Sequence, residues 1–194
     1  MPPHAVAPRG RVMDIKSNDT ALLFREHPMP RVMSVSDSIV VALDPAAVYA
    51  QVSDLGQMGR WSPENLGATV PAGGVAAGTV FEGHNKRGPV RWTTRCVVLA
   101  AEPGVRFAFR VEAMGLGPRF VRARIATWEY SFEPVDGGTR VTETWHDDRR
   151  WPKPLADLFD RVVTRGHVFA DYQRRNIATT LANLKTALES TAAR

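Results

Sequence analysis

The group best suited to chemistry in this sequence is a glutamate inside an alternating segment. Glu143 lies between Val141 and Trp145 at alternate positions. Alternate side chains of a β-strand share one face, so a face that buries the valine and the tryptophan also buries the glutamate. A buried carboxylate is costly unless it is paired or protonated. Two interpretations follow: a proton-transfer or ligand-orienting group, or a residue at the wet end of the strand that is bonded to a helix arginine.

The same parity places other polar side chains on this face. Phe81 brings Asn85 with it, and Trp92 brings Thr94 and Cys96. Cys96 lies in the middle of a strand among apolar residues, where a free cysteine is usually inert packing. Nucleophilic catalysis is therefore not expected.

No pattern for metal or phosphate binding accompanies these groups. The five histidines are far apart and lack the spacing of metal ligands. The run His146-Asp147-Asp148 lies at a strand end, where three adjacent side chains do not converge on one point. Gly73-Gly74 and Gly137-Gly138 are typical of turns rather than of a phosphate loop. We expect neither a metal nor a cofactor.

Five segments with strand-like alternation would position these residues. They are Thr79 to Lys86, Val90 to Ala101, Arg106 to Glu112, Arg122 to Glu133 and Thr139 to His146. Large apolar side chains recur at every second position, which predicts an antiparallel sheet with one bulky apolar face. The residues expected on this concave face are Phe81, Trp92, Phe107, Phe109, Trp128, Tyr130, Val141 and Trp145.

One of these segments changes phase. Trp128 and Tyr130 occupy even positions, but the earlier apolar residues are odd. A bulge near Ala126 would reconcile the two phases by turning the strand. Alternatively, Arg122 and Arg124 face inward at the mouth of the hollow.

The region before these strands predicts one strand and two short helices. Val35 to Val41 is rich in β-branched residues. Asp44-Pro45 is a helix start, with the aspartate as N-cap, and Asp54 begins a second helix that stops near Gly59. Trp61 follows and is expected at the pocket entrance. Residues 67–78 are expected to form a loop with at most one short strand.

The chain then predicts one long C-terminal helix, from about Leu155 to Ser190. The prolines of Trp151-Pro152-Lys153-Pro154 suit the entry to a helix. Apolar residues recur at three- and four-residue steps. This stripe is expected to face the sheet, and its members are Leu155, Leu158, Val162, Phe169, Ile177, Leu181, Leu184 and Leu188. A curved sheet that grips one helix leaves a hollow between them.

Composition suits a globular domain with a tail. The chain has 194 residues, of which 44% are hydrophobic and 23% charged. No apolar stretch approaches the ~20 residues of a membrane-spanning helix, and Met1 to Arg11 lacks the apolar core of a secretory signal. The single Cys96 excludes an internal disulfide and fits a cytoplasmic location. We expect residues 1–31, which contain many prolines, to be a flexible tail before a domain over 32–194.

The net charge of +5 comes mostly from scattered arginines. An anionic partner is one interpretation, but scattered charges are typical of a solvated face. Zinc-finger spacing, an RNA-binding strand signature and a helix-turn-helix pattern are all missing. Nucleic-acid binding is therefore not expected.

These elements and local sequences resemble the START-like, or SRPBCC, helix-grip superfamily, specifically its polyketide cyclase/dehydrase-like branch. The matching stretches are Asp44 to Tyr49, Trp61-Ser62-Pro63, Gly78 to Asn85, Arg91 to Thr94, Glu102-Pro103-Gly104, Trp128 to Pro134 and Gly137 to Glu143. The resemblance covers about Val32 to Ser190. It implies an α+β helix-grip fold, in which a curved antiparallel sheet wraps around a long C-terminal helix, with two short helices after the first strand.

The first hypothesis for function is binding of an apolar or aromatic small molecule, lipid- or polyketide-like, between the sheet and the C-terminal helix. A non-enzymatic carrier is favoured over an enzyme because no catalytic constellation rises above single residues. The expected ligand contacts are Trp61, Phe81, Asn85, Trp92, Thr94, Phe107, Phe109, Trp128, Tyr130, Glu143, Trp145 and Phe169.

Two alternatives belong to other classes of function. One is a cofactorless cyclase or dehydratase, in which Glu143, Tyr130 or Asn85 transfers protons and stabilises an enolate. The other is a module that binds a protein or a membrane surface and has a filled core. An empty volume of at least ~300 Å³ beside Glu143 would favour ligand binding or catalysis over the filled module.

Overall fold

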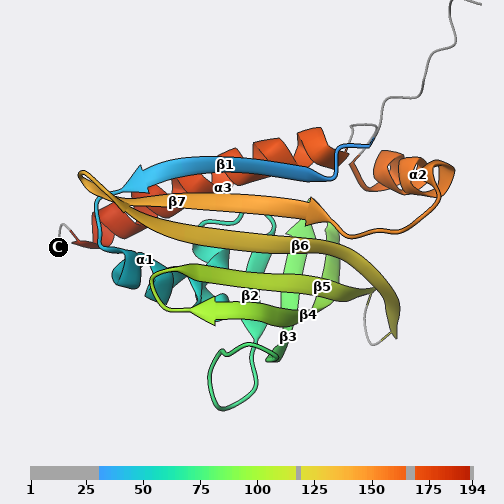
Figure 1. Cartoon of the computed structure of the whole chain (residues 1–194). Coiled ribbons are helices and arrows are strands. Elements are labelled where there is room, and N and C mark those ends of the chain that lie inside the picture. The colour runs from blue at the N-terminus through green and yellow to red at the C-terminus, as the bar shows by residue number, and fades with distance from the viewer. Residues whose placement is uncertain (1–30, 117–118, 165–168, 193–194) are drawn as a thin grey trace, which may run out of the picture. The chain divides into compact units, whose positions relative to one another are not determined.

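The structure is a computed structural model that describes residues 31–116, 119–164 and 169–192. The predicted tail lies outside the described residues except for Arg31. The elements follow in the predicted order of one strand, two short helices and further strands, but two C-terminal helices stand where one was predicted (Figure 1). They are β1 (Ser34–Val41), α1 (Pro45–Val52), the 3-10 helix η2 (Leu55–Arg60), β2 (Asn65–Thr69), β3 (Val80–Arg87), β4 (Val90–Glu102), β5 (Arg106–Leu116), β6 (Arg119–Val135), β7 (Gly138–Asp147), α2 (Lys153–Thr164) and α3 (Phe169–Ala192).

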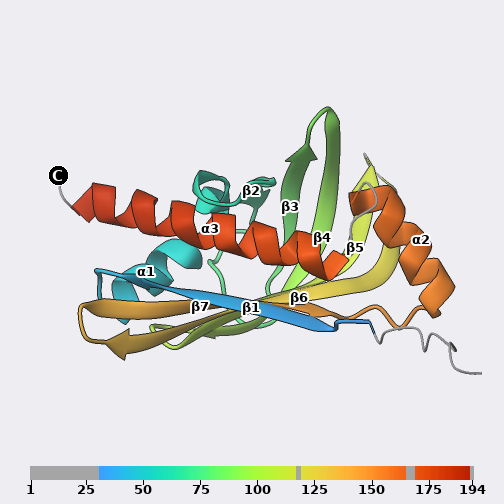
Figure 2. The ribbon, with the colours of Figure 1, turned by 90° about the horizontal axis from the view of Figure 1, so that it is seen from above.

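The strands form one antiparallel sheet in the order β1-β7-β6-β5-β4-β3-β2. The first strand pairs with the last, so that Val35 lies opposite Trp145 and Val41 opposite Thr139. β2 begins two residues before the predicted loop, overlaps its start and pairs with β3. The sheet curves around α3: β1, β6 and β7 run beneath the helix, and β3 and β4 rise beside it (Figure 2). This is the expected helix-grip fold.

Local signals set where the two short helices begin. The Asp44 carboxylate accepts a hydrogen bond from the Ala47 amide at 2.9 Å, and Pro45 occupies the first helical turn. Asp54 caps η2 in the same way through the Gly56 amide, at 3.2 Å. α1 packs against β5, β6 and β7, so the short helices cover one end of the concave face.

Pairing across the sheet confirms the predicted concave face. Trp128 lies directly opposite Phe109 on one side and Trp145 on the other. Tyr130 lies opposite Glu143. Side chains that are directly opposite in neighbouring strands share a face. The remaining predicted members are buried or half-buried: Phe81, Trp92, Phe107 and Val141.

A bulge in β6 explains its change of phase. Residues 123–125 of β6 lie opposite the single residue 112 of β5. The consecutive residues Ile125 and Ala126 are both buried within this irregular stretch, so the phase changes just before Ala126, as the first alternative predicted. Arg122 and Arg124 are exposed, and the Arg124 guanidinium lies 3.7 Å from the Glu112 carboxylate. The two arginines therefore do not face the hollow.

The C-terminal pattern forms two helices rather than one. α2 and α3 run in different directions (Figure 2), so the prediction of a single helix from about Leu155 to Ser190 is wrong in its first part. α3 alone lies within the curve of the sheet. Its buried apolar residues are Phe169, Ala170, Ile177, Leu181, Leu184 and Leu188.

The apolar stripe of α2 does not pack into the core. Leu155, Leu158 and Val162 were expected to face the sheet, but Leu158 is 60% exposed and Val162 is 72% exposed. The buried side of α2 instead carries Ala156 and Asp160. The prediction was wrong because a polar contact, rather than the apolar stripe, determines which side of α2 faces the domain.

That polar contact is made by a buried arginine. Arg149 is 1% exposed, and its guanidinium donates to Asp147 at 2.8 and 2.7 Å and to Asp160 of α2 at 2.5 Å. The rings of Phe159 and Phe169 lie 5.5 and 4.8 Å from the guanidinium carbon. Burial acts to lower the pKa of Arg149, but the two aspartates outweigh it and raise that pKa above its ordinary value. The charged network thus joins α2 to the end of β7.

Arg31 extends this network. Its guanidinium lies 3.3 Å from the Asp147 carboxylate and donates to the Arg149 carbonyl oxygen at 2.5 Å. The contacts of the described domain therefore include Arg31.

Candidate ligand-binding cavity

A cavity of about 1090 Å³ lies among the concave face of the sheet, α2 and α3. Its wall consists mainly of aromatic and aliphatic side chains. The aromatic members are Phe81, Trp92, Phe109, Trp128, Tyr130, Trp145, Trp151, Phe159 and Phe169. Polar side chains also line the wall, but most of its exposed surface is apolar, so the cavity suits an apolar molecule with a few polar groups.

Most of the residues predicted as ligand contacts line this cavity. They are Phe81, Asn85, Trp92, Thr94, Phe109, Trp128, Tyr130, Glu143, Trp145 and Phe169. Strand parity selected all of them except Phe169, and it places them on the side of the sheet that faces α3, to which Phe169 belongs.

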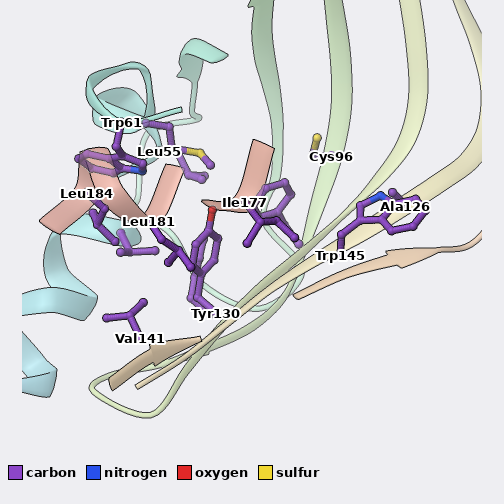
Figure 3. Packing of buried hydrophobic residues seen from close by; sticks show 14 of the residues in the cluster. Leu55, Trp61, Cys96, Ala126, Tyr130, Val141, Trp145, Ile177, Leu181 and Leu184 are labelled. Carbon is purple, nitrogen blue, oxygen red and sulfur yellow. The ribbon is translucent and has the colours of Figure 1, made fainter. Parts of the chain in front are cut away.

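Trp61 and Phe107 are the two predicted contacts that do not line this cavity, and both belong to the packed core. Trp61 is 1% exposed, and its carbonyl oxygen accepts from Asn183 Nδ2 at 3.0 Å. Figure 3 shows it in the core cluster near Leu184 rather than at an entrance. The Phe107 ring meets the Tyr49 ring edge-on, with centroids 6.3 Å apart. Since the short helices cover this end of the sheet, aromatic residues here fill the core instead of lining the cavity.

Tyr130 and Glu143 form a buried pair in the cavity wall. The Tyr130 hydroxyl donates to Glu143 Oε1 at 2.9 Å. Tyr130 rises from the sheet with its hydroxyl directed toward α3 (Figure 3). The structure thus gives Glu143 a tyrosine partner, whereas the second interpretation of the sequence expected a helix arginine.

The surroundings of Glu143 favour its neutral form. Its side chain is 2% exposed, and Oε2 has no hydrogen-bond partner. Burial raises the pKa of Glu143 to about 8, although the hydrogen bond from Tyr130 acts to lower it. Burial, followed by the nearby Glu143 carboxyl, raises the pKa of Tyr130 well above its ordinary value. Near neutral pH the pair therefore holds both protons.

A short polar strip lies on β3 and β4. Asn85 Nδ2 donates to Thr94 Oγ1 at 3.3 Å, and the Cys96 thiol lies 3.6 Å from the same oxygen. Burial raises the pKa of Cys96 to about 12. A thiol with so high a pKa is a poor nucleophile, in agreement with its predicted role as packing.

The sequence interpretation missed the part of the cavity wall that α2 supplies. Leu155, Leu158, Phe159 and Val162 all line the cavity. A regular apolar stripe shows that one side of a helix avoids water but does not identify the surface that it faces. The available signal was Gly166, in the sequence between the two helices, because glycine disfavours a helix interior.

A polar cluster at another part of the wall was also missed. Glu64 accepts hydrogen bonds from Tyr172 of α3 and from Arg87 of β3, and from Asn176 Nδ2 at 3.3 Å. Burial, then the contact with Glu64, raises the pKa of Tyr172. The cluster joins α3 to the strands beside it. No sequence signal marks it, because Glu64 and Tyr172 are 108 positions apart.

Two further properties concern metals and membranes. Within residues 31–116, 119–164 and 169–192, His, Cys, Asp and Glu side chains form no group of three that could hold a metal ion. None of the helices in this part of the chain has the length and apolar character needed to cross a membrane.

Comparison with known sequences identifies one matching family. The family model described as polyketide cyclase/dehydrase and lipid transport matches residues 32–189. No curated protein matches the sequence.

Solved structures with the same fold come from several bacteria. The polyketide-cyclase-like protein Cgl2372 from Corynebacterium glutamicum is 29% identical, with a TM-score of 0.55 over 84% of this chain and 96% of that one. A START superfamily protein from Mycobacterium smegmatis is 13% identical, with a TM-score of 0.59 over 82% and 99%. Protein NE0264 from Nitrosomonas europaea is 13% identical, with a TM-score of 0.60 over 84% and 97%. The last two likenesses concern the fold alone.

Proposed function

Because the chain belongs to the polyketide cyclase/dehydrase and lipid transport family, we propose that it binds an apolar or aromatic small molecule in the cavity among the sheet, α2 and α3. Lipid-like and polyketide-like molecules are the classes that we consider. A carrier role is favoured over an enzymatic one, because the thiol of Cys96 is neutral and the described part of the cavity wall offers a single buried acid.

The observation that carries this proposal is the size and lining of the cavity. Its volume of about 1090 Å³ exceeds the ~300 Å³ at which small-molecule sites begin. A cavity of that size without a ligand would leave the aromatic side chains of its wall without packing partners, which costs free energy. A protein- or membrane-binding module with a filled core would not need such a space.

Purification without detergent followed by native mass spectrometry tests the proposal. We expect a co-purifying small molecule that is released on denaturation. The neutral dye Nile red provides a second measurement, since its emission increases in an apolar site. Neither a bound molecule nor saturable dye binding would contradict the proposal.

A matched pair of variants identifies the site of dye binding. Leu158→Ser changes an exposed leucine in the cavity wall, and Leu99→Ser changes an exposed leucine of β4 outside it. We expect Leu158→Ser to weaken Nile red binding severalfold, because apolar contact area is lost. Leu99→Ser should leave the affinity unchanged.

A cofactorless cyclase is the second candidate, and the Tyr130–Glu143 pair favours it. A neutral Glu143 could give its proton to a carbonyl oxygen while an enol carbon of the same substrate attacks that carbonyl, and the Glu143 carboxylate would then take up the proton that the enol hydroxyl releases. Before the attack, Tyr130, or Asn85 of the polar strip, would stabilise the enol or enolate oxygen. Cyclisation of a synthetic poly-β-keto thioester above the spontaneous rate, abolished in Glu143→Gln, would support this candidate. A rate equal to the spontaneous one would exclude cyclisation of that substrate.

A further inference from the structure

Residues with an unpartnered polar atom are concentrated in the cavity wall. In the described part of the chain, the buried side-chain atoms without a hydrogen-bond partner are Trp61 Nε1, Glu143 Oε2, Trp145 Nε1 and Gln173 Oε1. All of these residues except Trp61 line the cavity. A buried polar atom without a partner costs free energy, so native proteins rarely leave one unpaired. A ligand that paired with these atoms would remove that cost.

The three residues lie near one another across the cavity. Glu143 and Trp145 are two residues apart on β7, about 6.8 Å along the strand, and share its concave face. The Trp145 ring lies 5.4 Å from the Phe169 ring of α3, centroid to centroid. Gln173 follows Phe169 by one helical turn, about 6 Å along the axis. The distance from Phe169 to Gln173 along α3 is thus about the same as the distance from Trp145 to Glu143 along β7.

The direction of α3 places Gln173 on the Glu143 side of Trp145. Near the other end of α3, Lys185 Nζ donates to the Val40 carbonyl oxygen at 2.6 Å. Val40 of β1 pairs with Arg140 of β7. Moving along α3 from Phe169 therefore follows β7 from Trp145 toward lower residue numbers, and Gln173 comes level with Glu143.

Each of the three atoms has a defined hydrogen-bonding role. The indole N–H of Trp145 can only donate, and Oε1 of Gln173 can only accept. Oε1 of Glu143 already accepts from Tyr130, so the proton of the neutral acid resides on Oε2, which then donates. Among residues 31–116, 119–164 and 169–192, the cationic members of the cavity wall are Arg87, which pairs with Glu64, and the exposed Arg119.

We infer that Glu143, Trp145 and Gln173 recognise an uncharged ligand that carries a carbonyl oxygen beside a hydroxyl group on an apolar body. The carbonyl oxygen accepts from Glu143 and Trp145, and the hydroxyl donates to Gln173. A fatty-acid carboxylate is disfavoured because no described cation of the cavity wall is free of an ion pair and buried with it, and a plain hydrocarbon leaves the three atoms unpaired. This inference rests on the proposed function and specifies the chemistry of its ligand.

Three neutral probes of nearly equal size separate the contribution of the carbonyl group to binding from that of the hydroxyl group. Ethylnaphthalene has neither group, acetylnaphthalene has the carbonyl, and hydroxyacetylnaphthalene has the carbonyl and the adjacent hydroxyl. Displacement of Nile red gives the affinity of each. We expect acetylnaphthalene to bind at least about fivefold tighter than ethylnaphthalene, and hydroxyacetylnaphthalene tighter again by a similar factor. In the wild-type protein, the indole N–H proton resonance of Trp145, assigned by its loss in Trp145→Phe, should move downfield with either ketone but not with ethylnaphthalene.

The variants assign each preference to a residue. Glu143→Leu and Trp145→Phe should each reduce the preference for acetylnaphthalene over ethylnaphthalene, and Gln173→Leu should remove only the preference for the hydroxyl. Gln57→Leu, on the exposed surface of η2, is the matched control and should keep both preferences. Each preference is a ratio measured within one variant, so a change in the amount of folded protein does not alter it.

The outcomes separate the inference from the proposed function. Equal affinities for the three probes in the wild-type protein would overturn the inference and leave the proposed function standing. Saturable binding with preferences that survive in all three cavity variants would also overturn it. Failure of every probe, with no binding of Nile red, would overturn the proposed function and the inference together.

Discussion

The Tyr130 hydroxyl donates a hydrogen bond of 2.9 Å to Glu143 Oε1 across the neighbouring strands β6 and β7. The two residues are directly opposite in the sheet, so the contact needs no distortion of either strand. One carboxyl oxygen is paired and the other has no partner. Glu143 therefore carries one unsatisfied polar atom at a residue that lines the cavity.

Glu143→Gln should stabilise the protein near neutral pH. The substitution keeps the shape of the side chain and the acceptor for Tyr130 but removes the ionisable proton. The folded-state pKa of Glu143 is raised from 4.5 to about 8, so its contribution to stability is fully present below pH 4.5 and is lost as pH rises toward 8. At pH 7 the variant should be more stable by roughly 3 kcal/mol, at about 1.4 kcal/mol for each unit of pKa shift.

Urea unfolding of both proteins between pH 5 and pH 9 measures this difference. It should grow from about pH 5 and level off above pH 8. Glu133→Gln, at an exposed position paired with Arg140, is the control and should show no comparable growth. A constant difference between the Glu143→Gln variant and the wild-type protein across this range would mean that Glu143 ionises normally in the folded state.

Arg149→Met should destabilise the protein by about 3–5 kcal/mol. The change leaves the buried carboxylates of Asp147 and Asp160 without their main cation. Arg174→Met removes an exposed ion pair with Asp171 and should change stability by less than about 1 kcal/mol. Urea unfolding at pH 7 compares the two. Similar effects of both changes would contradict a special role for the buried network.

Phe169→Ala should cost about 3 kcal/mol or more. The side chain is 8% exposed and packs on Trp145, so its removal loses buried area and enlarges the cavity. Leu158→Ala, in the exposed part of the same wall, should cost less than about 1 kcal/mol. Thermal and urea unfolding test the contrast. A neutral Phe169→Ala would mean that this ring lies against open solvent rather than against the core.

Deletion of residues 1–30 should leave the melting temperature nearly unchanged, because their proline-rich sequence has little apolar surface to bury. Deletion of residues 1–31 should lower the melting temperature more than the shorter deletion does. Arg31 contacts Asp147 and the Arg149 carbonyl oxygen, and the longer deletion removes both contacts. Calorimetry of the two truncated proteins gives the difference. A large loss from the shorter deletion would show that residues 1–30 stabilise the domain.

Strand parity and helix capping were the features that could be predicted from the sequence. Trp128, Tyr130 and Trp145 share a face because alternation is a local property of an extended chain. Asp44 begins α1 because its carboxylate reaches an amide only three residues away. Such interactions are within a few residues of one another, so the residue types and their spacing are sufficient to predict them. The family resemblance added the arrangement of these elements.

Only the tertiary structure decided which surfaces the predicted faces meet. The stripe of α2 was correctly predicted to be apolar, but the Arg149–Asp160 contact determines that Leu158 lies in the cavity wall instead of the core. Trp61 fills the core because η2 and α3 meet there. Glu143 pairs with Tyr130 because the hairpin of β6 and β7 places them opposite each other. Each outcome depends on residues far apart in the chain, whose distances are set by packing of the whole domain rather than by sequence spacing.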